Sequence, residues 1–357
     1  MTTLPLAKHT ALLITSPANI LYFSSIAIDS GVFLIITPTK KFICTDARCI
    51  REATRMATGF TPLVLSHENP TLLAHTLKKQ GVKILYFEPY HLSYHTLMTL
   101  KKQCRGIAQL KPAPFNLREI RAIKTTKEIA HITQAAHIAE HILAACVHRI
   151  RNALKSGALL SEYDLVLAIH KEALAHGCEK LSFSPIIAFG KNTGVPHHSP
   201  KHNRRLHTGD RVLIDMGVLN NHYCSDITRT FFTTPPTTRQ AHIYEKVLAA
   251  QKLALQQISH GAQTSKLVEN INNFLGRDAK YFTHGLGHGV GLEIHEYPSL
   301  KTKTAETLCE NEVITVEPGL YFSWGGVRIE DMVLVQKNGN RLLTHFPKEL
   351  SHMILHR

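Results

Sequence analysis

Two aspartates in one predicted hairpin constrain this chain more than any other feature of its sequence. The segment from Arg211 to Phe232 predicts two strands joined by a tight turn at Asn220-Asn221, because asparagine tolerates the positive φ angles that a two-residue type I′ turn requires. In that register Asp215 and Asp226 are direct cross-strand neighbours, with Cβ atoms about 4.5–5.5 Å apart. Like charges so placed destabilise a sheet unless a cation lies between them.

The pair alone leaves a second interpretation open, with one aspartate in a turn and the other at a solvated strand end. The residues before Asp215 favour burial, because Val212-Leu213-Ile214 is an uninterrupted apolar run. A lone buried carboxylate is costly. The sequence therefore predicts a cation site whose further ligands come from elsewhere in the chain.

The composition is that of an ordinary globular protein, with 44% hydrophobic and 19% charged residues among 357, a length that predicts about two domains. We find neither a signal-peptide core nor an apolar stretch of about 18 residues, so secretion and membrane spanning are not expected. Seven scattered cysteines predict reduced thiols in a cytoplasmic protein. The net charge of +14 comes in short clusters without aromatic interleaving, which predicts a solvated basic surface and no specific nucleic-acid partner.

The first part of the chain, residues 1–116, predicts a mixed α/β domain. Its strands are expected at 11–15, 20–23, 32–36, 41–44 and 83–87, and its helices at 47–57, 70–79 and 92–102. The prolines of Pro112-Ala113-Pro114 mark the boundary that follows.

The second part, residues 117–357, predicts long helices over an antiparallel sheet, so the fold class is α+β. One helix is expected to begin at the capping box Thr125–Glu128, and Ser161–Asp164 is expected to cap a second that ends at Gly177. A third long helix is expected from Thr238. No internal repeat or low-complexity tract interrupts this part of the sequence.

A glycine-rich segment carries the candidate histidines. His284 and His288 are four residues apart, as on a zinc-binding helix, but the alternating glycines between 285 and 291 argue against a helix. Their spacing also fails the dinucleotide-binding pattern. An extended glycine-rich backbone can approach a crowded site closely. A flexible loop that contains histidines by chance would have the same sequence pattern, so this alternative stays open.

Two glutamates lie in apolar strands further on. Glu317 ends the run that starts at Val313, and Glu330 lies between Ile329 and Met332. Arg328 shares a strand face with Glu330, so the alternative is a surface ion pair between them that contributes little to stability. Two carboxylates in apolar surroundings, added to the aspartate pair, favour a buried site.

Together these segments supply four carboxylates and one imidazole. The four negative charges of the carboxylates balance two divalent cations. Two ions about 3.5–4 Å apart can polarise a carbonyl and lower the pKa of a water molecule. Oxygen-rich ligation with one histidine suits Mn, Co, Fe or Zn. The five candidate ligands are Asp215, Asp226, His288, Glu317 and Glu330.

Six segments, in order, resemble the pita-bread-fold metallopeptidases, and within them the Xaa-Pro aminopeptidases and Xaa-Pro dipeptidases (prolidases). The catalytic resemblance runs from about residue 117 to the C-terminus. The first domain is similar to the creatinase-like domain of the same enzymes, at Ser16–Tyr22 and Thr45–Arg48. The matching catalytic segments are the aspartate pair, Ser225–Thr230, His284–His288, His295-Glu296, Glu317–Tyr321 and Gly326–Asp331.

The resemblance implies a role for each matching residue. Asp215 would chelate one metal ion, His288 and Glu317 would chelate the other, and Asp226 and Glu330 would bridge both. Catalytic roles fall to His197, His295 and Glu317, with Glu317 accepting the proton of the attacking water. Substrate-binding and supporting roles fall to His284, Tyr321 and Arg328. His197 is preferred over His198 because it directly follows the proline.

The activity that the resemblance implies is metal-dependent hydrolysis of the Xaa-Pro bond of peptides with proline at the second position. We expect an Xaa-Pro aminopeptidase, with an Xaa-Pro dipeptidase as the alternative and a non-catalytic peptide-binding module as a rival. The expected cofactors are two divalent ions per subunit, Mn first and Co, Zn or Fe as alternatives, in a homodimer. Thr233–Pro236 and Asn311 depart from the family's pattern, which concerns loop shape and not the ligands.

Overall fold

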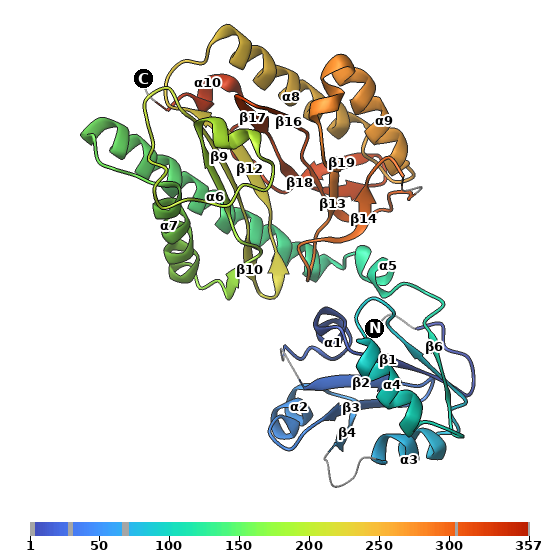
Figure 1. Cartoon of the computed structure of the whole chain (residues 1–357). Coiled ribbons are helices and arrows are strands. Elements are labelled where there is room, and N and C mark those ends of the chain that lie inside the picture. The colour runs from blue at the N-terminus through green and yellow to red at the C-terminus, as the bar shows by residue number, and fades with distance from the viewer. Residues whose placement is uncertain (1–3, 28–30, 66–70, 304–305, 356–357) are drawn as a thin grey trace. The chain divides into compact units, whose positions relative to one another are not determined.

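The computed structural model describes residues 4–27, 31–65, 71–303 and 306–355 (Figure 1). The chain divides into two compact units, Met1–Ile120 and Arg121–Arg357. Within the described ranges, none of the helices combines the length and apolar character that a membrane crossing requires.

The first unit is built on a six-stranded mixed sheet with strand order β4-β3-β2-β1-β5-β6. Alternate residues of β1 face two different cores, Leu13 in one and Leu12 in the other, so both faces of the sheet are covered. The strands are β1 (Thr10–Ile14), β2 (Val32–Ile36), β3 (Lys41–Thr45), β4 (Thr61–Val64), β5 (Ile84–Phe87) and β6 (Gln109–Pro112). The helices are α1 (Pro17–Ser24), α2 (Ile50–Met56), α3 (Leu72–Lys79) and α4 (Tyr94–Gln103).

The strand predicted at 20–23 is wrong, because this segment belongs to helix α1. Ser16 precedes the helix and Pro17 occupies its first turn, where the missing N–H costs nothing. Ile20 and Phe23 are buried one helical turn apart. A run of four apolar residues fits either period, and here the proline start decides. The prediction for Pro70 lies outside the described residues.

The second unit packs long helices on antiparallel strands, as predicted, with one more helix than the three expected (Figure 1). The predicted capping box is present at Thr125/Glu128, and the predicted cap at Ser161/Asp164 is a capping box as well. The helices are α6 (Thr126–Ser156), α7 (Glu162–Ala175), α8 (Thr238–Gln257) and α9 (Thr264–Leu275), with the short α10 (Leu350–Met353). The short α5 (Leu117–Ala122) contains the boundary between the two units. Helix α9 was not predicted; its N-cap Gln263 makes no side-chain capping bond.

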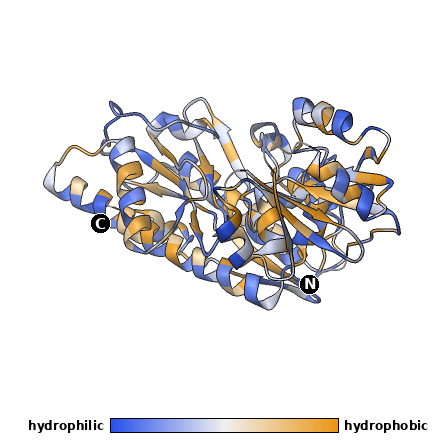
Figure 2. Cartoon of the chain, turned by 90° about the horizontal axis from the view of Figure 1, so that it is seen from below, coloured by the Kyte–Doolittle hydropathy of each residue, from blue (hydrophilic) through white to orange (hydrophobic). Residues whose placement is uncertain are grey.

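The strands of the second unit form two larger antiparallel sheets and two small ones. The two larger sheets have the orders β12-β9-β8 and β14-β13-β15-β18-β19. The two small sheets have the orders β11-β10-β7 and β16-β17. Apolar residues concentrate on these strands (Figure 2) and form one large core with the helices. The main strands are β8 (Ile186–Phe189), β9 (Arg211–Met216), β12 (Ile227–Phe232), β13 (Gly287–Gly289), β14 (Glu296–Leu300), β15 (Val313–Val316), β18 (Asp331–Gln336) and β19 (Gly339–Leu342). The small sheets use β7 (Lys180–Leu181), β10 (Val218–Asn220), β11 (Tyr223–Cys224), β16 (Gly319–Phe322) and β17 (Gly325–Arg328).

The predicted hairpin register is wrong. The turn lies one residue later than predicted, so each residue of the first strand pairs with a residue two positions further along the second. The turn residues are Asn221 and His222, both with positive φ, and Asp215 lies opposite Thr228. Glu179 explains the choice of turn, because its carboxylate accepts hydrogen bonds from the backbone and ring of His222 at 2.8 and 2.9 Å. Asp226 is therefore diagonal to Asp215, still on the same face of the ribbon, two residues before Thr228.

Gly217 separates β9 from β10 at the point where the hairpin bends. A Cβ atom at this position would overlap the backbone carbonyl oxygen of Ser225. Only glycine lets the two backbones approach this closely. Gly217 lies two residues after Asp215 and Ser225 directly precedes Asp226, so this close approach lies next to both aspartates.

We expect Gly217→Ala to lower the free energy of unfolding by about 2–4 kcal/mol, because the clash involves backbone and cannot relax. Denaturant unfolding of the purified protein measures this. Gly261→Ala is the matched control: its Cβ would meet open space and only the positive φ of +88° opposes it, so about 1 kcal/mol is expected. Equal losses in the two variants would contradict the role given to Gly217.

Candidate metal centre

Five strand and loop segments bring the predicted ligands together in the second unit. Asp215 lies in β9, Asp226 between β11 and β12, and His288 in β13. Glu317 directly follows β15, and Glu330 lies between β17 and β18. The last position corrects the prediction that Glu330 is inside a strand: it forms an isolated bridge with Thr228.

The ligand atoms of these residues are neighbours. One ligand atom each from Asp226, His288 and Glu330 lie within 4.8 Å of one another. The Nε2 atom of His288 is 3.6 Å from Oδ2 of Asp226 and 3.6 Å from Oε1 of Glu317. Asp215 and Glu317 lie close enough to raise the pKa of Asp226 electrostatically. The arrangement crowds four carboxylates around one imidazole.

This crowding is unfavourable for a protein without counter-ions. Burial first, and then the repulsion of neighbouring carboxylates, raises the pKa of Asp226 and of Glu330 well above the usual range. Burial likewise raises the pKa of Glu317 to about 8. Among the described residues, the buried Oδ1 atoms of Asp215 and Asp226 have no hydrogen-bond partner. Unpaired buried carboxylate oxygens beside a histidine nitrogen fit divalent cations well.

His288 is held in the form that a metal ligand requires. Its Nδ1 atom donates to the carbonyl oxygen of Gly289 at 3.1 Å, which directs the Nε2 lone pair toward Asp226 and Glu317. Burial and the neighbouring His295 lower its pKa to about 4, so the ring is neutral. The flanking Gly287 is needed because a Cβ there would overlap the carbonyl oxygen of Thr315. The close backbone approach predicted for this glycine-rich segment is thus confirmed.

Arg328 and Thr228 connect the carboxylates. Arg328 forms a buried ion pair with Asp215, and its Nε atom donates to the hydroxyl of Thr228 at 3.2 Å. The same hydroxyl donates to Oε2 of Glu330 at 2.6 Å. Since Arg328 and Glu330 are 3% and 1% exposed, the surface ion pair considered as an alternative is wrong.

A chain of hydrogen bonds runs from Arg328 to His284 through Tyr321. The guanidinium donates to the Tyr321 hydroxyl at 2.7 Å, and that hydroxyl lies 2.7 Å from Nε2 of His284. The Nδ1 atom of His284 donates to the Gly285 carbonyl, so Nε2 accepts the tyrosine proton. Burial and then Arg328 lower the pKa of His284 to about 4. Arg328, fully engaged, is placed to orient Asp215 and Tyr321.

A second buried pair lies directly behind Glu330 and escaped prediction. Arg229 donates to the Glu330 carbonyl at 2.5 Å and to Asp331 at 2.7 Å. Burial opposes ionisation of Asp331, but Arg229 and Lys348 together lower its pKa. The sequence held a signal for this pair: Arg229 and Asp331 are charges inside apolar strands, and buried charges require partners.

The structure separates the two adjacent histidines at 197 and 198. His198 is buried, and its Nε2 donates to Glu162 at 2.9 Å. His197 is exposed and close enough to His284 and His295 to lower the pKa of each electrostatically. The ring of His295 lies 4.4 Å from that of His288, centroid to centroid. His197, and not His198, therefore faces the centre.

Glu162 organises the segment that carries His197, and it was missed because the sequence there predicts only a helix cap. Its fully buried carboxylate accepts hydrogen bonds from the backbone N–H of Phe189 at 2.8 Å and of Lys201 at 2.9 Å. Asn192 donates a third, also at 2.8 Å. With His198, these bonds fix both ends of residues 189–201.

Comparisons with known proteins give the family of this chain. The family model described as "Metallopeptidase family M24" matches residues 130–337. The model described as "Creatinase/Prolidase N-terminal domain" matches residues 6–123. The chain belongs to metallopeptidase family M24. The predicted pita-bread fold with a creatinase-like first domain is confirmed, and the family's name implies that divalent metal ions take part.

Individual relatives cover nearly the whole chain. An Xaa-Pro dipeptidase of Pyrococcus horikoshii is 33% identical over 95% of this chain and 94% of its own length. The structure of an Xaa-Pro dipeptidase from Bacillus anthracis has a TM-score of 0.89 at 30% identity, covering 95% of this chain and 94% of the other. An X-Pro aminopeptidase structure from Thermotoga maritima has a TM-score of 0.86 at 27% identity, covering 95% and 96%.

The metal-free protein should lose stability as pH rises. The pKa values of Asp226, Glu317 and Glu330 are raised by folding, so the folded state binds more protons than the unfolded chain. The free energy of unfolding then decreases from about pH 4, where unfolded carboxyls titrate, to about pH 8, the pKa of Glu317. We expect the thermal midpoint of metal-free protein to fall over this range.

Asp226→Asn is the control for this pH dependence, because it removes one charge and keeps the shape. The wild-type midpoint should fall more steeply with pH than that of the variant, and Mn²⁺ should remove most of the difference. A wild-type midpoint that rises relative to Asp226→Asn between pH 5 and pH 8 would contradict the crowding described here.

Glu162→Gln should lower kcat for peptide hydrolysis about tenfold with the metal content unchanged, since His197 loses its fixed position. Steady-state kinetics and metal analysis of the same samples measure both quantities. Glu179→Gln is the matched control, because Glu179 also bonds a backbone N–H and a histidine but at the distant hairpin turn. A Glu162 variant with unchanged kcat would exclude the positioning role.

Proposed function

We propose that this protein is an Xaa-Pro dipeptidase that uses two divalent ions, Mn²⁺ first among them. The observation that carries the metal-dependent chemistry is the convergence of four carboxylates and one neutral imidazole, with two carboxylate oxygens left unpaired. The substrate class follows from the relatives: those named above act on Xaa-Pro substrates, two as dipeptidases and one as an aminopeptidase. They support our alternative better than the aminopeptidase that we expected.

Asp215, Asp226, His288, Glu317 and Glu330 would hold the ions, as the sequence predicted. When bound, such ions polarise a carbonyl group and lower the pKa of water. The protein's own residues then supply orientation and proton transfer. A non-catalytic peptide-binding module is disfavoured, because such a module has no need to bury these carboxylates together.

Glu317 is the carboxylate best placed to exchange a proton with water. Its side chain is 17% exposed, compared with 11% for Asp215 and 6% for Asp226, while Glu330 is 1% exposed as a residue. It would accept the proton of the attacking water and return it to the leaving nitrogen. That nitrogen is the tertiary amide nitrogen of proline, which carries no hydrogen of its own and must be protonated to leave.

The surrounding histidines would bind the substrate carbonyl. His197 and His295 are exposed imidazoles beside the centre, and both can donate a hydrogen bond to developing negative charge. His284 and Tyr321 form a fixed wall through their mutual hydrogen bond. A homodimer and a cytoplasmic location stay predictions of this proposal.

A dipeptide differs from longer substrates by a free carboxylate near the scissile bond. Arg328 is already engaged by Asp215, Tyr321 and Thr228. Lys301 is exposed, and its charge adds to the effect of burial and of the neighbouring histidines, which lower the pKa of His288 and of His295. We expect Lys301 to attract the carboxylate of a dipeptide.

Purified Mn-loaded protein should cleave Ala-Pro with a kcat/KM at least about tenfold above that for Ala-Pro-Ala, a difference of about 1.4 kcal/mol. Lys301→Gln should raise KM for Ala-Pro about fivefold, as a partly screened ion pair allows, with kcat unchanged. Lys303→Gln, two residues on and also exposed, is its matched control.

Asp226→Asn completes the experiment and should cleave neither peptide. Cleavage of Ala-Pro-Ala alone would establish the aminopeptidase in place of the dipeptidase. Full activity of Asp226→Asn would contradict the metal centre itself, and equal effects of the two lysine variants would remove Lys301 from the substrate site.

A further inference from the structure

A second group of metal-ligating side chains lies at the surface of the second unit, away from the catalytic ligand set. His137 and Glu140 project from α6, and His345 lies in the segment after β19. One ligand atom from each lies within 4.8 Å of the other two. Residues three apart on a helix share a face, so α6 presents its two side chains in the same direction.

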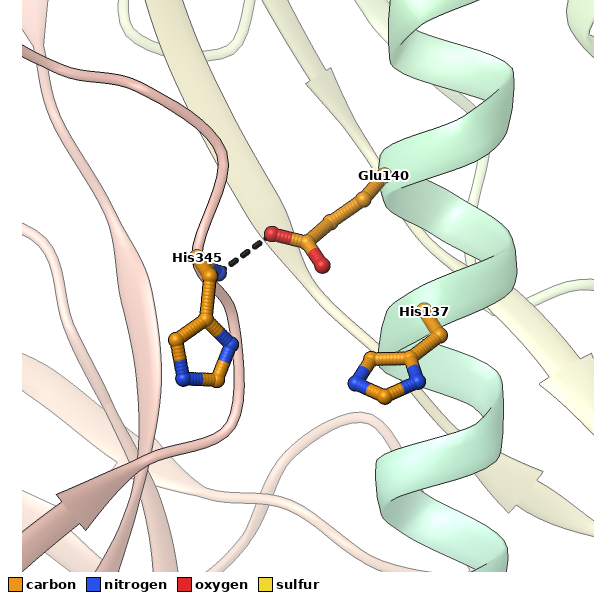
Figure 3. A group of neighbouring side chains, drawn as sticks. All are labelled: His137, Glu140 and His345. Atoms are coloured by element: carbon orange, nitrogen blue, oxygen red, sulfur yellow. Dashed lines mark hydrogen bonds between the residues drawn. The ribbon is translucent and has the colours of Figure 1, made fainter.

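The geometry of this group is fixed without any ion. Oε1 of Glu140 accepts hydrogen bonds from the backbone N–H groups of His345 and Phe346. Figure 3 shows both imidazole rings on the side of the carboxylate where its second oxygen lies. The three side chains therefore surround one common position, and the carboxylate is already oriented by its bonds to the backbone.

The segment that carries His345 is held firmly on its inner side as well. Thr344 donates to Asp331 at 2.8 Å, and Lys348 donates to the same carboxylate at 2.5 Å. The carbonyls of Phe346 and Pro347 accept from Arg229 at 2.7 and 3.1 Å. These are the residues packed behind Glu330, so His345 belongs to a segment that supports the catalytic centre.

The donor set selects a class of ion. Two imidazole nitrogens and one carboxylate oxygen match the three-ligand sites in which Zn²⁺ takes water as its fourth ligand. Cu²⁺ and Ni²⁺ favour the same donors, whereas Mg²⁺ and Ca²⁺ require more oxygens. This set differs from the catalytic one, where carboxylates outnumber imidazole.

We propose that His137, Glu140 and His345 form a Zn²⁺ site that links α6 to the segment Thr344–Lys348. An ion at this position ties the helix to the segment through three side chains. It stabilises the segment that holds Arg229 and Asp331 behind Glu330. The site does not depend on which peptide the enzyme cleaves.

Zinc counting tests the proposal directly. Metal-free wild type and the double variant His137→Gln/His345→Gln are dialysed against the same micromolar free Zn²⁺, and bound zinc is measured by emission spectrometry. We expect the double variant to bind one ion fewer per chain. His148→Gln is the matched control, an exposed histidine on the same helix paired with Asn152, and should bind as many ions as wild type.

Equal zinc content in wild type and the double variant would overturn the proposal, as would the loss of one ion in His148→Gln. Circular dichroism checks the fold of each variant. The single variant His137→Gln leaves the His345 segment untouched, so it repeats the test if the double variant is unfolded. Its thermal midpoint should also rise less with Zn²⁺ than that of the control.

Discussion

The catalytic unit is arranged around the repulsion between four carboxylates that the fold buries together. Burial and mutual repulsion raise the pKa values of Asp226, Glu317 and Glu330, which means that the folded chain disfavours their charges. The fold tolerates this because Arg328 neutralises Asp215 and Thr228 donates to Glu330. One cationic side chain cannot balance four carboxylates, which is consistent with the divalent ions that the family's name implies.

Precise placement of these ligands depends on groups that never meet an ion. Arg229 and Asp331 fix the backbone at the Glu330 carbonyl and directly after it, and Gly287 lets the strand of His288 approach Thr315. Glu162 fixes the segment of His197 from the far side. Rigid support of this kind is what a site needs when its ligands come from separate strands.

The sequence predicted which charged side chains come together better than it predicted the elements that carry them. Charged residues at the ends of apolar strands are visible without a structure, and so are the capping boxes of α6 and α7. The hairpin register was not predictable, because Asn220-Asn221 and Asn221-His222 both accept positive φ and the choice depends on Glu179, 43 residues away. Glu162 was missed for a similar reason: the groups that it binds follow 27 to 39 residues later.

We propose that divalent ions lie among Asp226, His288 and Glu330. Anomalous diffraction at the manganese absorption edge from crystals grown with Mn²⁺ tests it most directly. We expect strong anomalous density between the carboxylates of Asp226 and Glu330 and within bonding distance of His288 Nε2. Crystals that contain Mn²⁺ elsewhere but show no anomalous density at this position would contradict it.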